Sequence, residues 1–325
     1  MTWRRRHVLA TDDWTRAEIE QVLETTKPML EVLSRPIRRA PPLRGRTVVL
    51  FFAEASTRTR VSFELAARSL SADVVNISAS GSSVEKGESL LDTVRTLEAL
   101  GGDIVVMRHQ ASGAPYFVAQ RSGAAVINAG DGWHAHPSQG LLDAYTLRNA
   151  LCELDGKRVV IVGDVLHSRV ARSDIEALVP LGARVTLSGP PTLMPAAWSG
   201  GAPPPGVAIE PNLDRALDNA DAVIALRLQR ERQDAGLIPS TREYSRVWGL
   251  TEERVARMRP GAPVMHPGPM NEGIEIDPAV AHGSRSLIET QVTNGVAVRM
   301  ALLFLLATGE AARTGAGAPS LEAVA

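Results

Sequence analysis

Short apolar runs alternate with segments of helical spacing from residue 45 onward, and this alternation constrains the fold more than any other feature. In the first half the strand-like runs are TVVLFF (47–52), DVVNIS (73–78), DIVVM (103–107) and AAVINA (124–129). Between them, Leu90, Leu91, Val94 and Leu97 keep the spacing of one helix face. The pattern predicts βαβ units, and therefore an α/β fold in which helices cover a parallel sheet.

The same pattern restarts near residue 150. The segment 136–156 is predicted to be a helix with Pro137 in its first turn. New strand-like runs then follow at 158–163, 184–189, 221–228 and 262–266. We therefore expect two doubly wound parallel-sheet domains joined by interdomain helices, with a Pro/Gly-rich surface segment (189–206) inside the second domain.

We place the first domain at residues 1–150 and the second at 151–285. Residues 286–310 are predicted to form one or two amphipathic helices that pack back on the first domain. The last segment, 311–325, is rich in Gly and Ala and is expected to be a flexible tail.

Charge and cysteine content limit the classes of partner and compartment. The formal net charge is −1, from 35 Lys and Arg against 36 Asp and Glu, so the overall balance favours neither nucleic acid nor an anionic membrane surface. The single Cys152 cannot form an intrachain disulfide, which fits a cytoplasmic protein. The amino terminus lacks the apolar core of a secretory signal, and the apolar stretch MALLFLLA (300–307) is far shorter than a membrane span of about 18 residues.

The stretch EASTRTR (54–60) places several hydrogen-bond donors directly after the first predicted strand. If a helix begins there, its first-turn N–H groups lack intrahelical partners and can bind an anion. Ser56 can cap that helix, Thr57 and Thr59 add hydroxyl donors, and Arg58 supplies a planar charged fork suited to phosphate. By itself, the stretch also fits an ordinary capped helix with solvated arginines.

Other polar side chains are predicted to lie near this position. Lys86, one of only three lysines, lies in a Ser/Gly-rich loop that suits a lid over a charged substrate, although a solvated loop residue is the simpler reading. Ligands of open α/β sheets gather beyond the carboxyl ends of strands. Residues expected at such ends are Arg108, His136 with the flanking His134, Gln139, Arg169, Arg227 and the motif HPGPM (266–270).

In combination, these motifs resemble the catalytic chain of the aspartate carbamoyltransferase family, along nearly the whole of residues 1–310. The motifs that carry the resemblance are STRTRVSFE, GSSVEKGESLLDT, NAGDGWHAHPSQGLLDAYT, VGDVLHSRVARS, LRLQRER and VMHPGPMNEG. STRTR-like motifs also occur in ornithine carbamoyltransferases, which are expected to carry HCLP and SMG motifs. This chain has HPGP and LRLQRER instead, and arginines there suit a dicarboxylate acceptor.

The resemblance implies transfer of a carbamoyl group from carbamoyl phosphate to the amino group of L-aspartate, with release of phosphate, in pyrimidine biosynthesis. No metal or other cofactor is expected. Implied carbamoyl phosphate contacts are Ser56, Thr57, Arg58, Thr59, Arg108, His136, Gln139, Pro267, Gly268 and Pro269. Implied aspartate contacts are Lys86, Arg169, Arg227 and Gln229. The catalytic set among these is Arg58, Thr59, Lys86, Arg108 and His136.

The resemblance also implies a homotrimer with shared active sites, in which the loop of Ser82 and Lys86 enters the site of a neighbouring subunit. A higher assembly with regulatory chains or dihydroorotase stays open. The sequence departs from the family pattern at Ala55, where Pro is common, and at Ser138, where Thr is usual. Ala55 frees a backbone angle that Pro would fix.

Three other functions are compatible with parts of the sequence. VVIVGD (159–164) suggests a nucleotide-dependent oxidoreductase, but it lacks the G-x-G-x-x-G pattern. A non-catalytic anion-binding subunit would retain the fold. A carbamoyltransferase with another acceptor is the strongest rival, because the motifs specify the donor side better than the acceptor side.

Overall fold

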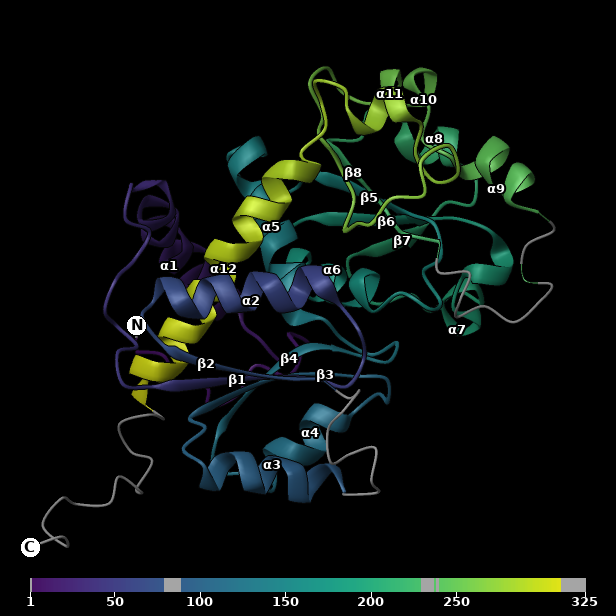
Figure 1. Cartoon of the computed structure of the whole chain (residues 1–325). Coiled ribbons are helices and arrows are strands. Elements are labelled where there is room, and N and C mark those ends of the chain that lie inside the picture. The colour runs from purple at the N-terminus through teal and green to yellow at the C-terminus, as the bar shows by residue number, and fades with distance from the viewer. Residues whose placement is uncertain (1, 79–88, 229–236, 238–239, 311–325) are drawn as a thin grey trace, which may run out of the picture.

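The computed structural model describes residues 2–78, 89–228, 237 and 240–310 (Figure 1). The first half contains α1 (Arg16–Ser34), β1 (Thr47–Phe52), α2 (Thr57–Ser69), β2 (Asp73–Ser78), α3 (Leu90–Ala99), β3 (Ile104–His109), α4 (Ala114–Ala119), β4 (Ala125–Asp131) and α5 (Pro137–Leu151). The second half contains β5 (Arg158–Val162), α6 (Arg169–Leu178), β6 (Arg184–Ser188), the 3₁₀ helix η2 (Pro191–Leu193), α7 (Ala196–Ser199), β7 (Val207–Ile209), α8 (Leu213–Leu217), β8 (Ala222–Ala225), α9 (Thr241–Trp248), α10 (Glu252–Ala256), β9 (Val264–Met265), α11 (Pro278–Ala281) and α12 (Ile288–Thr308).

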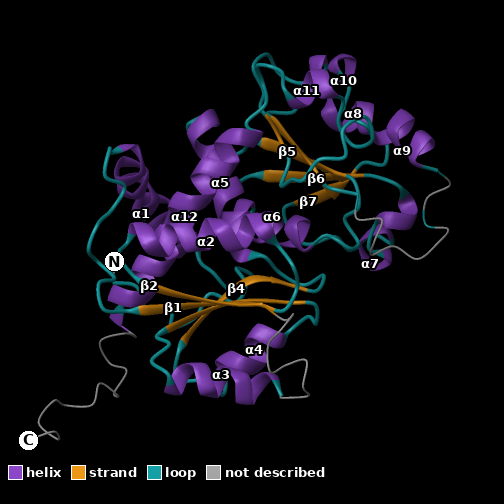
Figure 2. Cartoon of the chain, viewed as in Figure 1, coloured by secondary structure: helices purple, strands orange, loops and turns teal. Residues whose placement is uncertain are grey.

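Two sheets organise the described part of the chain, one in each half. The strand order is β2-β1-β3-β4 in the first sheet and β7-β6-β5-β8-β9 in the second. All paired strands of both sheets run parallel. Helices cover both faces of each sheet (Figure 2). The predicted fold class, two doubly wound parallel-sheet units, is therefore confirmed; we call them the first and second lobes.

The strands follow the predicted runs closely, with differences at their ends. β1 and β2 have the predicted bounds, whereas β3 continues through Arg108 and His109, so that Arg108 lies in the strand instead of after it. The short β7 lies outside the predicted elements. It has three residues, none of them buried, and it follows the Pro/Gly-rich segment, so no apolar run marks it.

One hydrophobic core joins the two lobes. Val48 and Leu50 of β1 share a cluster of buried residues with Val159 and Ile161 of β5. Val49 and Phe51, which alternate with them in β1, belong to a separate cluster with residues of α3 and α4. Between the sheets lie α2, α5, α6 and α12, as Figure 2 shows. Because strands alternate their side chains, each sheet is buried on both faces, as parallel sheets require.

α12 is a single helix and differs from the predicted amphipathic helices. It packs against α1, α2 and α5, and residues from Ala297 to Leu303 are all buried. In the described part of the chain it alone is long and apolar enough to cross a membrane by length and composition, but 67% of that apolar window is buried inside the protein. Contact on several sides explains why its apolar residues do not form one stripe.

The junction of α5 and α6 depends on a glycine. A Cβ at Gly140 in α5 would overlap the backbone carbonyl oxygen of Ser173 in α6. Ser173 also accepts a hydrogen bond at its Oγ from the backbone N–H of His136, at 2.9 Å. The close approach of the two helices therefore places the start of α5 against the second lobe.

We predict that Gly140→Ala lowers the free energy of unfolding by about 1–3 kcal/mol, because the added methyl group overpacks a backbone-to-backbone contact. Denaturant unfolding measures this. Gly200→Ala is the control: a Cβ there meets its nearest atom at 3.5 Å, an ordinary contact, and its effect should stay within about 0.5 kcal/mol. Equal effects of the two substitutions would contradict the proposed role of the contact.

Candidate active site

The predicted site residues lie where the strand order of each sheet reverses. In the first sheet, β1 is followed by β2 on one side and β3 on the other; the end of β1 leads to Ser56, and the end of β3 carries Arg108. In the second sheet, β5 and β8 lead to Arg169 and Arg227. Such switch points form the crevices in which open α/β sheets bind ligands.

The start of α2 differs in one detail from the prediction. Ser56 occupies the N-cap position, but its side chain makes no capping hydrogen bond. Its backbone carbonyl oxygen accepts the N–H of Arg60 at 3.1 Å, as in an ordinary helix start. The hydroxyl of Ser56 is therefore not used by the helix, and the first-turn N–H groups lack intrahelical acceptors.

A cavity of about 80 Å³ begins beside this turn and lies between α2, α5, α12 and the loop after β9. Five predicted residues line it, namely Arg58, Thr59, Gln139, Pro267 and Gly268. A Cβ at Gly268, whose φ is +62°, would overlap the guanidinium of Arg58. Glycine therefore lets the loop approach Arg58 closely, and the next peptide bond, to Pro269, is cis.

Glu54 holds two of the predicted arginines together across the lobes. Its Oε1 accepts Arg108 Nη2 at 2.7 Å and Arg169 Nη2 at 2.8 Å, and its Oε2 accepts Arg169 Nη1 at 3.1 Å. Arg169 also donates to the carbonyl oxygen of Gly132 at 3.1 Å. Arg169 is only 3% exposed, so this bridge is largely removed from water. We call it the Glu54 bridge.

His136 lies at the N-cap of α5 and is buried. Burial, together with the charges of Arg108, Arg169 and Arg299, lowers the pKa of its ring well below 6.5. Its Nδ1 is buried and has no hydrogen-bond partner among the described residues. The ring is therefore neutral at physiological pH, and a neutral imidazole can donate one N–H to a carbonyl oxygen.

Further positive charge surrounds the same space. Burial, and then the nearby charge of Arg227, lowers the pKa of Arg58. Arg299 of α12 is 5% exposed and lines the cavity; burial lowers its pKa to about 10, with Arg58 and Arg108 also acting in that direction. Its Nη1 donates to Ser62 Oγ at 2.9 Å. Cations from both lobes thus converge on one small region, which favours binding of anions.

Sequence reasoning missed Glu54 and Arg299. Glu54 stands in EASTRTR, but its partner Arg169 lies 115 residues away. Arg299 carried a usable signal, since a charged residue inside an apolar helix is rarely buried without a role. Three predicted residues, Ser82, Lys86 and Gln229, lie outside the described residues.

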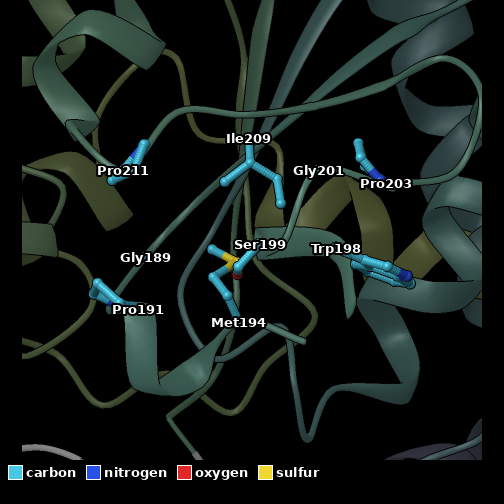
Figure 3. Close-up of a pocket in the computed structure, with 9 residues that line it drawn as sticks. All are labelled: Gly189, Pro191, Met194, Trp198, Ser199, Gly201, Pro203, Ile209 and Pro211. Carbon is cyan, nitrogen blue, oxygen red and sulfur yellow. The ribbon is translucent and has the colours of Figure 1, made fainter. Parts of the chain in front are cut away.

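The described residues contain no group of three or more His, Cys, Asp or Glu side chains that could hold a metal ion. A larger cavity of about 390 Å³ lies in the second lobe, and none of its nine lining residues is ionisable (Figure 3). Trp198, Met194 and several prolines give it an apolar wall. The larger cavity therefore lacks the charged side chains that line the smaller one.

The fold and the site define a class: a two-lobed α/β protein with an anion site at the lobe boundary. Residues 6–149 match the family model described as aspartate/ornithine carbamoyltransferase, carbamoyl-P binding domain. Residues 155–306 match the model for the Asp/Orn binding domain of that family. The chain belongs to the aspartate/ornithine carbamoyltransferase family.

Among its relatives, the aspartate carbamoyltransferase catalytic subunit of Chloroflexus aggregans is 62% identical over 94% of this chain and 100% of its own length. A Trypanosoma cruzi aspartate transcarbamoylase, solved with N-(phosphonacetyl)-L-aspartic acid, matches with a TM-score of 0.83 and 28% identity, over 93% of this chain and 96% of that one. The Pyrococcus furiosus ornithine carbamoyltransferase matches with a TM-score of 0.81 and 27% identity, over 94% of this chain and 98% of that one. The fold is therefore common to enzymes of both acceptor classes.

Because the pKa of His136 is lowered in the folded protein, we predict that stability depends on pH through this residue. Below about pH 6.5 the His136 ring takes up a proton in the unfolded chain but not in the folded one. The free energy of unfolding is therefore highest above pH 6.5 and decreases as the pH falls. Relative to the His136→Asn variant, the free energy of unfolding of the natural protein should decrease by up to about 1.4 kcal/mol for each pH unit below 6.5. Denaturant unfolding between pH 7.5 and 5 measures the difference.

His7 provides a positive control, because burial, and then Arg6, lowers its pKa to about 4 and His7 is outside the site. His7→Asn should also flatten the pH profile of stability. Parallel profiles for the natural protein and His136→Asn would show that the folded ring of His136 is protonated like the unfolded one.

Proposed function

We propose that this chain catalyses the aspartate carbamoyltransferase reaction. It transfers the carbamoyl group of carbamoyl phosphate to the amino group of L-aspartate, giving N-carbamoyl-L-aspartate and phosphate in pyrimidine biosynthesis. The observation that carries the proposal is the convergence of Arg58 and Arg108 from one lobe with Arg169 and Arg227 from the other. One arginine pair per lobe suits two anionic substrates that must meet at the boundary.

We assign the carbamoyl phosphate side to the first lobe and the loop after β9. Arg58 and the α2 amino terminus bind the phosphate, with the hydroxyls of Ser56, Thr57 and Thr59. Arg108 bridges phosphate and carbonyl oxygen, and His136 donates to the carbonyl oxygen. Gln139 and the loop Pro267–Pro269 orient the NH₂ group. Arg169, Arg227, Gln229 and Lys86 bind aspartate.

The chemistry follows from charge and position. The uncharged amine of aspartate attacks the carbonyl carbon and negative charge develops on the carbonyl oxygen. The bond from the carbonyl carbon to the phosphate oxygen then breaks, and the leaving phosphate takes the proton that the amine loses. A neutral His136 and the guanidinium group of Arg108, which Glu54 holds at the end of β3, stabilise that charge. In the described structure the guanidinium group of Arg169 donates to Glu54. The carboxylates of bound aspartate would therefore compete with Glu54 for the N–H groups of Arg169.

Steady-state release of phosphate from carbamoyl phosphate, with a panel of acceptors, tests the function. Aspartate should be the best acceptor, and Arg58→Ala should lower the rate by about 10²–10³, as loss of one transition-state donor does. Arg16→Ala is the matched control, because Arg16 pairs with Glu20 on the exposed surface of α1, and it should leave the rate unchanged. Higher activity with ornithine than with aspartate would overturn the assignment.

We also propose a cytoplasmic homotrimer with shared active sites. Val61 and Leu65, one turn apart on α2, are 41% and 50% exposed, and exposed apolar pairs of this kind suit a subunit contact. The family resemblance of the loop with Ser82 and Lys86 supports a contribution to a neighbouring site. The domain roles, carbamoyl phosphate binding by 1–150 and aspartate binding by 151–285, belong to the same proposal.

Mixing two inactive variants tests the shared site. Lys86→Ala and Arg58→Ala chains, dissociated and reassembled together, should regain activity, because some sites then combine an intact Arg58 with an intact Lys86 from the neighbour. Random assembly of a cyclic trimer gives about one quarter such sites. Full activity in a particle with the mass of one chain, or no gain on mixing, would contradict the proposal.

A further inference from the structure

A buried carboxyl group lies directly behind the cavity, and the proposed function gives it no role. Asp143 of α5 is 0% exposed. Gln139 Nε2 donates to its two oxygens at 3.2 and 3.1 Å, and Gln291 Nε2 of α12 donates to its Oδ1 at 2.6 Å. Both glutamines line the cavity. Asp143 therefore contacts the two side-chain amides that border the space proposed for the carbamoyl group.

The contact with Asp143 fixes which end of the Gln139 amide faces the cavity. An ionised carboxylate only accepts hydrogen bonds, so it selects the NH₂ end of the glutamine. The Oε1 of Gln139 is then left as the acceptor toward the cavity. An acceptor at this position matches a ligand NH₂ group and offers nothing to a methyl group.

Gln291 links Asp143 to the loop after β9. Its Oε1 accepts the backbone N–H of His266 at 3.0 Å, while its Nε2 is held by Asp143. His266 Nδ1 in turn accepts the N–H of Gly268 at 2.7 Å. One continuous chain of hydrogen bonds thus runs from Gln139 through Asp143 and Gln291 to the loop that holds Pro267.

Asp174 of α6 helps Asp143 to remain a pure acceptor. Asp174 is 0% exposed, and no N–H or hydroxyl group of the described residues donates to its oxygens. The two carboxyl groups share a hydrogen bond, which requires one proton between them. Burial, with the charge of Asp143, raises the pKa of Asp174 well above 3.8, so Asp174 carries the proton and donates it. Burial raises the pKa of Asp143 to about 6, and the hydrogen bonds from Gln291 and Gln139 and the charge of Arg299 oppose that rise, so Asp143 is ionised above this pH.

We propose that Asp143 is a positioning residue that presents Gln139 and the His266–Gly268 loop as hydrogen-bond acceptors, and that this makes the cavity select an acyl phosphate bearing NH₂ over one bearing CH₃. The inference rests on the proposed function, since it concerns the donor of that reaction. Asp143 acts through Gln139 and Gln291 and does not itself touch the substrate.

Binding of three probes to the full-length protein tests this selection. Carbamoyl phosphate, acetyl phosphate and inorganic phosphate share the phosphate group, and the first two differ only in NH₂ against CH₃. In Asp143→Asn, which can turn a donor toward Gln139, the affinity for carbamoyl phosphate should fall about tenfold to a hundredfold, as expected for loss of well-placed hydrogen bonds. The affinities for acetyl phosphate and inorganic phosphate should stay within about twofold.

Two matched controls separate positioning from general damage. Asp174→Asn supplies an N–H donor to Asp143 without a shared proton and should preserve the preference for carbamoyl over acetyl phosphate. Thr146→Val removes the hydrogen bond from Asn294 Nδ2, 2.9 Å long, which joins α5 and α12 one turn farther along; it should preserve the preference too. Loss of preference in either control to the extent seen in Asp143→Asn would overturn the inference.

Gln291→Met provides a second variant should Asp143→Asn fail to fold. It breaks the link between Asp143 and the loop and should lower the preference for carbamoyl phosphate several-fold, roughly the effect of one hydrogen bond. An unchanged preference in every folded variant at Asp143 and Gln291 would overturn the inference. If the natural protein forms no N-carbamoyl-L-aspartate, the proposed function fails instead, so the two failures are distinguishable.

Discussion

Mutual repulsion of guanidinium groups at the lobe boundary is the constraint on which the rest of the structure depends. Burial, and then the nearby charge of Arg227, lowers the pKa of Arg58. Arg299 is buried nearby, and Arg108 and Arg169 share the Glu54 bridge. The carboxylates of Glu54 and Asp143 offset part of this charge. The remainder favours a small anion between the lobes, and low exposure strengthens that attraction because water screens it less.

The helices between the sheets keep these charges at fixed positions. α5 brings His136 and Gln139, α6 begins with Arg169, and α12 brings Arg299. The close contact at Gly140 sets the spacing of α5 and α6, and the network of Asp143 ties α5 to α12. The site is therefore built mainly on helix starts and buried helix faces, which are more rigid than loops.

The sequence predicted the local structure and the chemistry of the site well, but it did not predict which side chains far apart in the chain contact each other. The runs 47–52 and 73–78 gave strand bounds directly, because periodicity and β-branched residues are local signals. The positions of the arginines followed from the rule for strand ends. The Glu54 bridge and the contact of Asp143 with Gln291 join residues 115 and 148 positions apart, so no local pattern reveals them. The unused hydroxyl of Ser56 likewise depends on backbone geometry and not on residue type.

The hydrophobic core that contains both β1 and β5 also affects how the molecule melts. Side chains of the two sheets meet in a single cluster, with α12 between them. Removing either lobe would expose apolar surface on the other, so heat should melt the two halves in one transition with a shared enthalpy. Because neither half can unfold alone, the site residues that the two lobes contribute are lost in the same transition.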